Sequence, residues 1–162
     1  ERKGRLEGLR VVIVGDILHS RVARSNIFGL SKFGCELRVV GPSTLIPPDI
    51  EKLGVKAFAN LESGIEGADV INVLRIQKER QHGALLPSID EYRELYMVRS
   101  EHLALAADDA IILHPGPMNR GIEISTELAE SSRCVVNEQV SNGVAVRMAI
   151  LYLLTSRRNV AM

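Results

Sequence analysis

Apolar and polar positions follow two different periods along this chain. Short runs of consecutive apolar residues recur, and most of them precede a segment whose apolar residues have helical spacing. The runs predict strands at residues 10–15, 36–41, 55–59, 69–74, 110–114 and 134–137. The segments between them predict helices at residues 20–33, 47–53, 60–67, 89–95, 100–107 and 126–131, with a closing helix at 139–155.

Strands that are nearly all apolar need cover on both faces, which is typical of parallel sheets. Their alternation with helices predicts an α/β fold, a doubly wound and mostly parallel sheet with helices on both faces, in a Rossmann-like three-layer sandwich. Ligands of such sheets bind beyond the carboxyl ends of the strands. Polar segments at residues 15–21, 75–80 and 114–121 all fall at these ends.

Composition narrows the class of protein. The 162 residues suit a single domain, and 20 Lys and Arg balance 20 Asp and Glu, so no overall charge favours nucleic acid or a membrane surface. The longest apolar stretch, 144–154, is interrupted by Arg147 and is too short to cross a bilayer. Cys35 and Cys134 lie far apart and outside any metal-binding spacing. We therefore expect free thiols and a cytoplasmic location.

The first polar segment, GDILHSR at 15–21, occupies the turn where dinucleotide-binding proteins carry a glycine fingerprint. Only Gly15 is present, which argues against an NAD or FAD oxidoreductase. The turn opens a helix whose first residues include Arg21, and a cation at that position opposes the helix dipole. Arg21 is either a tolerated surface residue or an arginine held to meet a carboxylate or phosphate.

The second polar segment follows the predicted strand at 69–74, where an apolar run changes abruptly to RIQKER. On extended backbone Arg75 and Gln77 point to the same side. A guanidinium and a carboxamide so placed can clamp one carboxylate, and Glu79 can fix the plane of the guanidinium. The alternative interpretation is a solvated loop.

The third polar segment begins with His114-Pro115-Gly116-Pro117. Two prolines around a glycine remove backbone N–H donors, stiffen the chain and expose carbonyl groups. Such a loop is suited to accept hydrogen bonds from the N–H groups of a ligand. A rigid turn without a ligand is the alternative.

Other chemistries lack their motifs. The histidines at 19, 82, 102 and 114 have no spacing typical of a metal site, and neither a GxSxG nor a Walker motif occurs. The candidate site residues are cationic or amide-like, without an evident nucleophile or general base. This set suits an enzyme that positions anions and stabilises charge in a transition state.

Four segments together resemble the C-terminal, aspartate-binding half of the aspartate carbamoyltransferase catalytic chain: GRLEGLRVVIVGDILHSRVARSN, NVLRIQKER, ILHPGPMNRGIEI and QVSNGVAVRMAILYLL. The resemblance implies that Arg21, Arg75 and Gln77 bind aspartate. It implies that the backbone carbonyls of Pro115, Gly116 and Pro117 hold the carbamoyl N–H₂ group. It also implies that Glu79 and Glu123 orient Arg75, and it gives no residue of this chain a direct catalytic role.

The implied reaction is transfer of a carbamoyl group from carbamoyl phosphate to the amine of L-aspartate, early in pyrimidine biosynthesis, with no metal or organic cofactor. The family's enzymes form homotrimers and bind carbamoyl phosphate through an N-terminal domain with an STRT motif, which is absent from this sequence. We therefore expect residues 1–162 to be the aspartate-binding domain, inactive alone, with the helix at 139–155 packing on the absent domain.

Two alternatives remain open at this point. One is an ornithine-type carbamoyltransferase, although that relative typically carries HCLP where this chain has HPGP. The other is a stand-alone module that binds small dicarboxylates.

Overall fold

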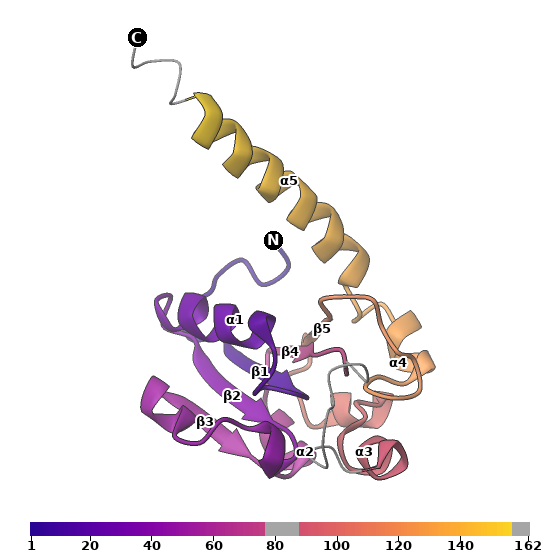
Figure 1. Ribbon diagram of the computed structural model, residues 1–162. Coiled ribbons are helices and arrows are strands. Elements are labelled where there is room, and N and C mark those ends of the chain that lie inside the picture. The colour runs from indigo at the N-terminus through magenta and orange to yellow at the C-terminus, as the bar shows by residue number, and fades with distance from the viewer. Residues whose placement is uncertain (77–87, 157–162) are drawn as a thin grey trace.

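The computed structural model of the protein describes residues 1–76 and 88–156. Its sheet has five parallel strands in the order β3-β2-β1-β4-β5 (Figure 1). The strands are β1 (Arg10–Val14), β2 (Glu36–Val40), β3 (Val55–Phe58), β4 (Val70–Val73) and β5 (Ile111–Leu113). The predicted α/β fold with a parallel sheet is confirmed.

Helices cover both faces of the sheet, each over its own hydrophobic core. Ala23 and Ile27 of α1 (Arg21–Ser31) pack on one face with Val11, Ile13 and other apolar strand residues. The opposite face is covered by α2 (Leu61–Ile65), α3 (Ile89–Tyr96) and α4 (Thr126–Glu130). Short 3₁₀ segments complete the layers: η1 (Ser43–Leu45), η2 (Ile50–Leu53) and η4 (Ser100–Ala104).

Side-chain caps set where the helices begin. The side-chain oxygens of Ser20, Asn60, Ser88 and Ser125 each accept a hydrogen bond from the backbone N–H three residues later. The cap at Ser20 makes Arg21 the first residue of α1, directly after the turn that leaves β1. This local geometry places Arg21 at the carboxyl edge of the sheet.

The predicted strand at 134–137 is wrong. Val136 already belongs to α5 (Val136–Ser156), and Cys134 makes only an isolated bridge to Ile112. The backbone N–H of Gln139 donates to the carbonyl of Val135 at 2.9 Å, so helical hydrogen bonding begins at once. The predicted helices at 47–53 and 100–107 are shorter 3₁₀ segments, η2 and η4.

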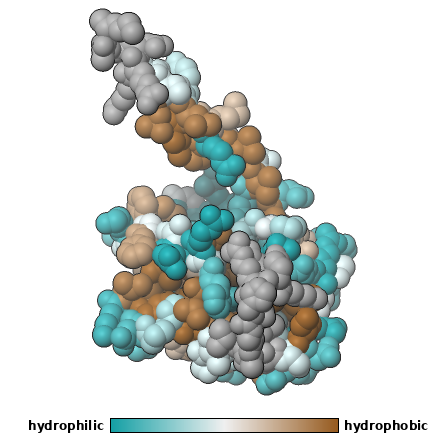
Figure 2. Space-filling model, viewed as in Figure 1, coloured by the Kyte–Doolittle hydropathy of each residue, from teal (hydrophilic) through white to brown (hydrophobic). Residues whose placement is uncertain are grey.

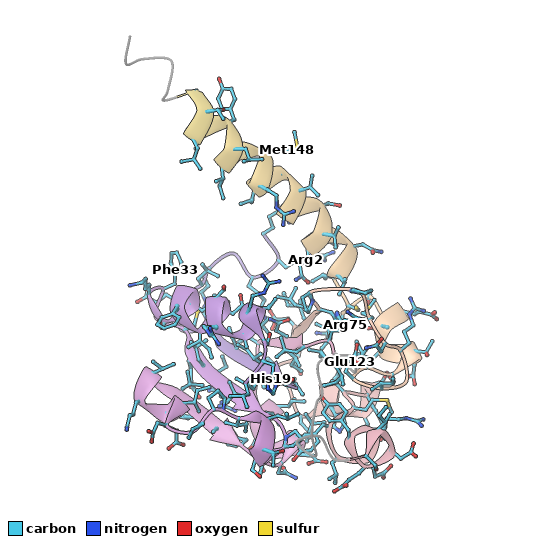
Figure 3. All side chains as sticks on the ribbon, in the orientation of Figure 1. Arg2, His19, Phe33, Arg75, Glu123 and Met148 are labelled. Carbon is cyan, nitrogen blue, oxygen red and sulfur yellow. The ribbon has the colours of Figure 1, made fainter. Side chains whose placement is uncertain are left out.

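Helix α5 projects away from the body of the molecule (Figure 1), and apolar side chains run along its length (Figure 2). Its exposed large apolar residues are Val140, Val144, Val146, Met148, Ile150, Leu151, Tyr152, Leu153 and Leu154. Met148 lies well away from the sheet, whereas Arg2 lies near the base of the helix, where it pairs with Glu138 (Figure 3). None of the described helices is long and apolar enough to cross a membrane.

A close backbone approach between the turns after β1 and β2 supports the carboxyl edge. A Cβ atom on Gly41 would lie 2.5 Å from the carbonyl oxygen of Gly15, so alanine at 41 is expected to destabilise the fold by about 1–3 kcal/mol. Gly29 is exposed in α1, and a Cβ atom added there would meet no other atom within 4 Å. It provides the control, because alanine at 29 should stabilise the helix by up to about 1 kcal/mol. Urea unfolding measures both changes, and equal shifts would contradict the packing argument.

Candidate functional site

A pocket of about 170 Å³ lies at the carboxyl edge of the sheet and joins the first, second and third polar segments. Arg21 and Arg75 line it together with Pro115 and Gly116, so residues far apart in sequence meet there. The complete lining is Asp16, His19, Ser20, Arg21, Val22, Leu74, Arg75, Pro115 and Gly116. The convergence expected of a parallel sheet therefore places both arginines in one cavity.

The two arginines reach the pocket from different elements. Arg21 is exposed at the start of α1, where the free N–H groups and dipole of the helix also favour an anion. Arg75 is half-buried and follows β4, an interior strand of the sheet, by two residues. Both side chains offer planar, forked donors that match the geometry of a carboxylate.

Asp16 and His19 also line the pocket and were not among the predicted site residues. The Asp16 carboxylate is buried, and Nδ1 of His19 lies 3.0 Å from each of its oxygens, while the backbone N–H of His19 donates to it at 3.1 Å. Because the carboxylate only accepts, Nδ1 of His19 is the donor in this contact. An Asp and a His three residues apart in the turn beside Arg21 were the available sequence clue.

The HPGP loop, residues 114–117, forms another part of the pocket wall. Pro115 and Gly116 line the pocket, whereas Pro117 is exposed, follows a cis peptide bond and is not part of the lining. Behind the loop, His114 and Glu123 have no exposed surface. The role of the Pro115, Gly116 and Pro117 carbonyls toward a ligand stays a prediction.

Glu123 is bonded to the back of this loop. Its carboxylate accepts from Nε2 of His114 at 3.1 Å, from the backbone N–H of Asn119 at 2.6 Å and from the side-chain amide of Asn119 at 3.1 Å. These contacts do not test the prediction that Glu123 orients Arg75. They show that the Glu123 carboxylate is hydrogen-bonded to His114 and Asn119. The places of Glu123, Arg75 and His19 in the molecule can be followed in Figure 3.

Gln77 and Glu79, the other predicted site residues, lie outside the described residues. Their assignment stays a prediction from sequence. Within residues 1–76 and 88–156, no group of three or more His, Cys, Asp or Glu side chains is arranged to hold a metal ion.

Tyr92 of α3 is fully buried beneath the site, with its hydroxyl 3.3 Å from where a Cβ atom on Gly15 would lie. Burial raises the pKa of its phenol, and the charges of Glu123 and Asp16 raise it further. Across the described part of the chain the hydroxyl has no hydrogen-bond partner. Since a buried, unbonded donor costs stability, Tyr92→Phe is expected to raise the free energy of unfolding by about 1 kcal/mol in urea titrations. A loss of stability would show that the hydroxyl has a bonded partner.

Comparison with known families decides the class of protein. The sequence model described as "Aspartate/ornithine carbamoyltransferase, Asp/Orn binding domain" matches residues 7–154. This chain belongs to the aspartate/ornithine carbamoyltransferase family.

Curated relatives of this carbamoyltransferase domain include catalytic subunits of aspartate carbamoyltransferase. The subunit from Syntrophomonas wolfei subsp. wolfei is 66% identical over 154 residues, which are 95% of this chain and 49% of the relative. The subunit from Desulforamulus reducens is 66% identical over 155 residues, 96% of this chain and 50% of the relative. The domain thus spans about half the length of the curated relatives it matches.

Solved structures share the fold of this carbamoyltransferase domain. The catalytic subunit of M. jannaschii aspartate transcarbamoylase matches with a TM-score of 0.76 and 31% identity, over 92% of this chain and 49% of that one. The ornithine carbamoyltransferase from Pyrococcus furiosus matches with a TM-score of 0.77 at 24% identity, over 93% of this chain and 50% of that one, which supports the fold alone.

Proposed function

We propose that this domain forms the amino-acid half of an aspartate carbamoyltransferase site. In the reaction, the amine of L-aspartate attacks the carbamoyl carbon of carbamoyl phosphate, the C–O bond to phosphate breaks, and the amine loses a proton. The products are N-carbamoyl-L-aspartate and phosphate, an early step of pyrimidine biosynthesis. The observation that carries the proposal is the meeting of Arg21, Arg75 and the HPGP loop in one small pocket.

The chemistry of the substrates matches these groups. L-Aspartate carries two carboxylates, and Arg21 and Arg75 each supply a guanidinium fork, with Gln77 as a further contact. The carbonyls of the HPGP loop suit the N–H₂ group of carbamoyl phosphate. Attack by an amine on a reactive carbamoyl group needs alignment and charge stabilisation, which fixed donors and acceptors provide.

The rest of the complete enzyme is part of the proposal. We infer that an N-terminal domain binds the phosphate of carbamoyl phosphate and covers α5, whose apolar side chains at 139–155 are exposed in the domain described here. Glu79 supports Arg75, the complete chain is a homotrimer, and it works in the cytoplasm without nucleic acid or membrane partners. The free thiols of Cys35 and Cys134 agree with a reducing compartment.

Turnover with and without the second half of the enzyme tests the proposal. The part of the Syntrophomonas wolfei relative outside the match is fused ahead of Glu1 to give a joined chain. Labelled carbamoyl phosphate and aspartate should give labelled carbamoyl aspartate with the joined chain and none with the 162-residue domain. Turnover by the domain alone would contradict its dependence on the second half, and a folded but inactive joined chain would contradict the activity.

A stand-alone dicarboxylate-binding module is the second candidate, favoured by the presence of both arginines in one preformed pocket. Calorimetry of the domain with succinate distinguishes a stand-alone module from half of an enzyme site. Binding in the micromolar range without the second half would favour a module, whereas no measurable heat would favour a half-site.

A further inference from the structure

The backbone N–H groups of the HPGP loop are all either missing or already bonded. Pro115 and Pro117 have none. The N–H of His114 donates to Oε1 of Gln139 at 3.0 Å, and the N–H of Gly116 donates to Nδ1 of His114 at 2.9 Å. The loop therefore offers only acceptors to a ligand.

The bond from Gly116 also fixes the tautomer of His114. Because the Gly116 N–H is a donor, Nδ1 of His114 accepts it and is unprotonated. The proton is then on Nε2, which donates to Oε1 of Glu123 at 3.1 Å. Both side chains are completely buried, so water does not compete for these bonds.

Asn119 extends this connection to the strand end that carries Arg75. Its side-chain amide donates to Oε2 of Glu123 at 3.1 Å and to the backbone carbonyl of Ile76 at 3.1 Å, and its backbone N–H donates to Oε1 of Glu123 at 2.6 Å. Ile76 is the next residue after Arg75 and is itself buried. One continuous set of hydrogen bonds thus runs from Gly116 to the backbone beside Arg75.

We propose that His114, Glu123 and Asn119 form a buried clamp of positioning residues that holds the loop carbonyls and Arg75 at a fixed separation. None of the three needs to touch substrate. The clamp presents the acceptor for the carbamoyl N–H₂ group and the donor for the aspartate carboxylate in the relative position that amine attack requires. This assignment of roles rests on the proposed function, and it gives Glu123 a primary function at the loop.

Two substitutions of His114 separate its two bonds. Asparagine places an oxygen near the position of Nδ1 and can accept from Gly116, whereas glutamine places an N–H near the position of Nε2 and can donate to Glu123. In the joined chain each substitution breaks one of the two bonds through which His114 joins the loop to Glu123, so His114→Gln and His114→Asn should each lower kcat at least about tenfold. Parent-like kcat in either variant would overturn the loop-holding role of His114.

His102 provides a matched control for loss of a buried histidine. It is 5% exposed in η4, and its Nδ1 accepts from the backbone N–H of Arg99 at 2.9 Å, the same kind of bond. His102→Gln, like the His114 variants, should lower the melting temperature, but it should leave kcat unchanged. A drop in kcat equal to that of His114→Gln would mean that both effects are only structural.

Asn119→Ala tests the other end of the clamp. It removes the bond to Ile76 and leaves the His114–Gly116 bond in place. The KM for aspartate should rise about tenfold, while the KM for carbamoyl phosphate changes less than about threefold. Equal rises in both KM values would contradict a link directed to Arg75.

A measurement on the 162-residue domain tests the clamp without any activity. Imidazole ¹⁵N spectra at pH 8 should show His114 with an unprotonated Nδ1 and a protonated Nε2, and Glu123→Gln should perturb the Nε2 signal. The opposite tautomer would overturn the clamp. The expected tautomer together with an inactive joined chain would instead contradict the proposed function and leave the hydrogen-bonded clamp intact.

Discussion

Arg75→Ala in the joined chain is expected to lower kcat/KM for aspartate about 10²- to 10³-fold. Arg75 is half-buried and lines the pocket together with Leu74, Pro115 and Gly116, and we expect its two-pronged bond to a substrate carboxylate to be partly shielded from water. Its loss leaves one carboxylate of aspartate without its main donor. Steady-state kinetics at saturating carbamoyl phosphate measure the change.

Arg93→Ala is the matched control for this substitution. Arg93 lies in α3 and forms a solvent-exposed pair with Asp90 at 3.3 Å, a type of contact worth at most about 1 kcal/mol. Its removal should leave kcat/KM unchanged. An Arg75→Ala enzyme as active as the Arg93→Ala enzyme would remove Arg75 from the site.

Arg21→Ala is expected to have opposite effects on activity and stability. As a cation on the first residue of α1, Arg21 opposes the helix dipole, so alanine should stabilise the domain by about 0.3–1 kcal/mol. The same change removes the second guanidinium of the pocket and should lower kcat/KM for aspartate about 10²-fold. Urea unfolding and kinetics on one preparation measure the pair of effects.

Arg21→Lys tests whether the site needs the planar guanidinium of Arg21 or only its positive charge. Lysine keeps the unfavourable charge at the helix start and loses the planar, two-pronged donor, so stability should match the parent while activity stays well below it. Full activity in Arg21→Lys would show that a point charge suffices. Unchanged activity in Arg21→Ala would contradict a binding role for Arg21.

The sheet was predictable because its strands are short apolar runs, and runs such as 10–15 and 36–41 have few other ways to be buried. The failure at 134–137 has the same origin. Cys134 to Val136 is equally apolar, but α5 begins at Val136 and its hydrogen bonds compete for that backbone. Periodicity over four residues does not separate a buried strand from a buried helix start.

The site was predictable where it depends on topology and unpredictable where it depends on side-chain contacts. Arg21, Arg75, Pro115 and Gly116 meet because parallel strands end at one edge of the sheet. The bonding of Glu123 to His114 and Asn119 depends on how the loop folds back on itself, which spacing alone does not encode. The Asp16–His19 pair was missed for the same reason, since its geometry is set by the turn.

The choice of the joined chain between aspartate and ornithine as substrate tests whether the pocket is built for a dicarboxylate. Initial rates are measured with aspartate and with ornithine at equal concentrations and saturating carbamoyl phosphate. Two arginines in one pocket favour a substrate with two carboxylates, and ornithine would place a cation beside a guanidinium. We predict carbamoyl aspartate as the product, with ornithine at least about 10²-fold slower. Faster turnover of ornithine would contradict an aspartate-binding role for Arg21 and Arg75.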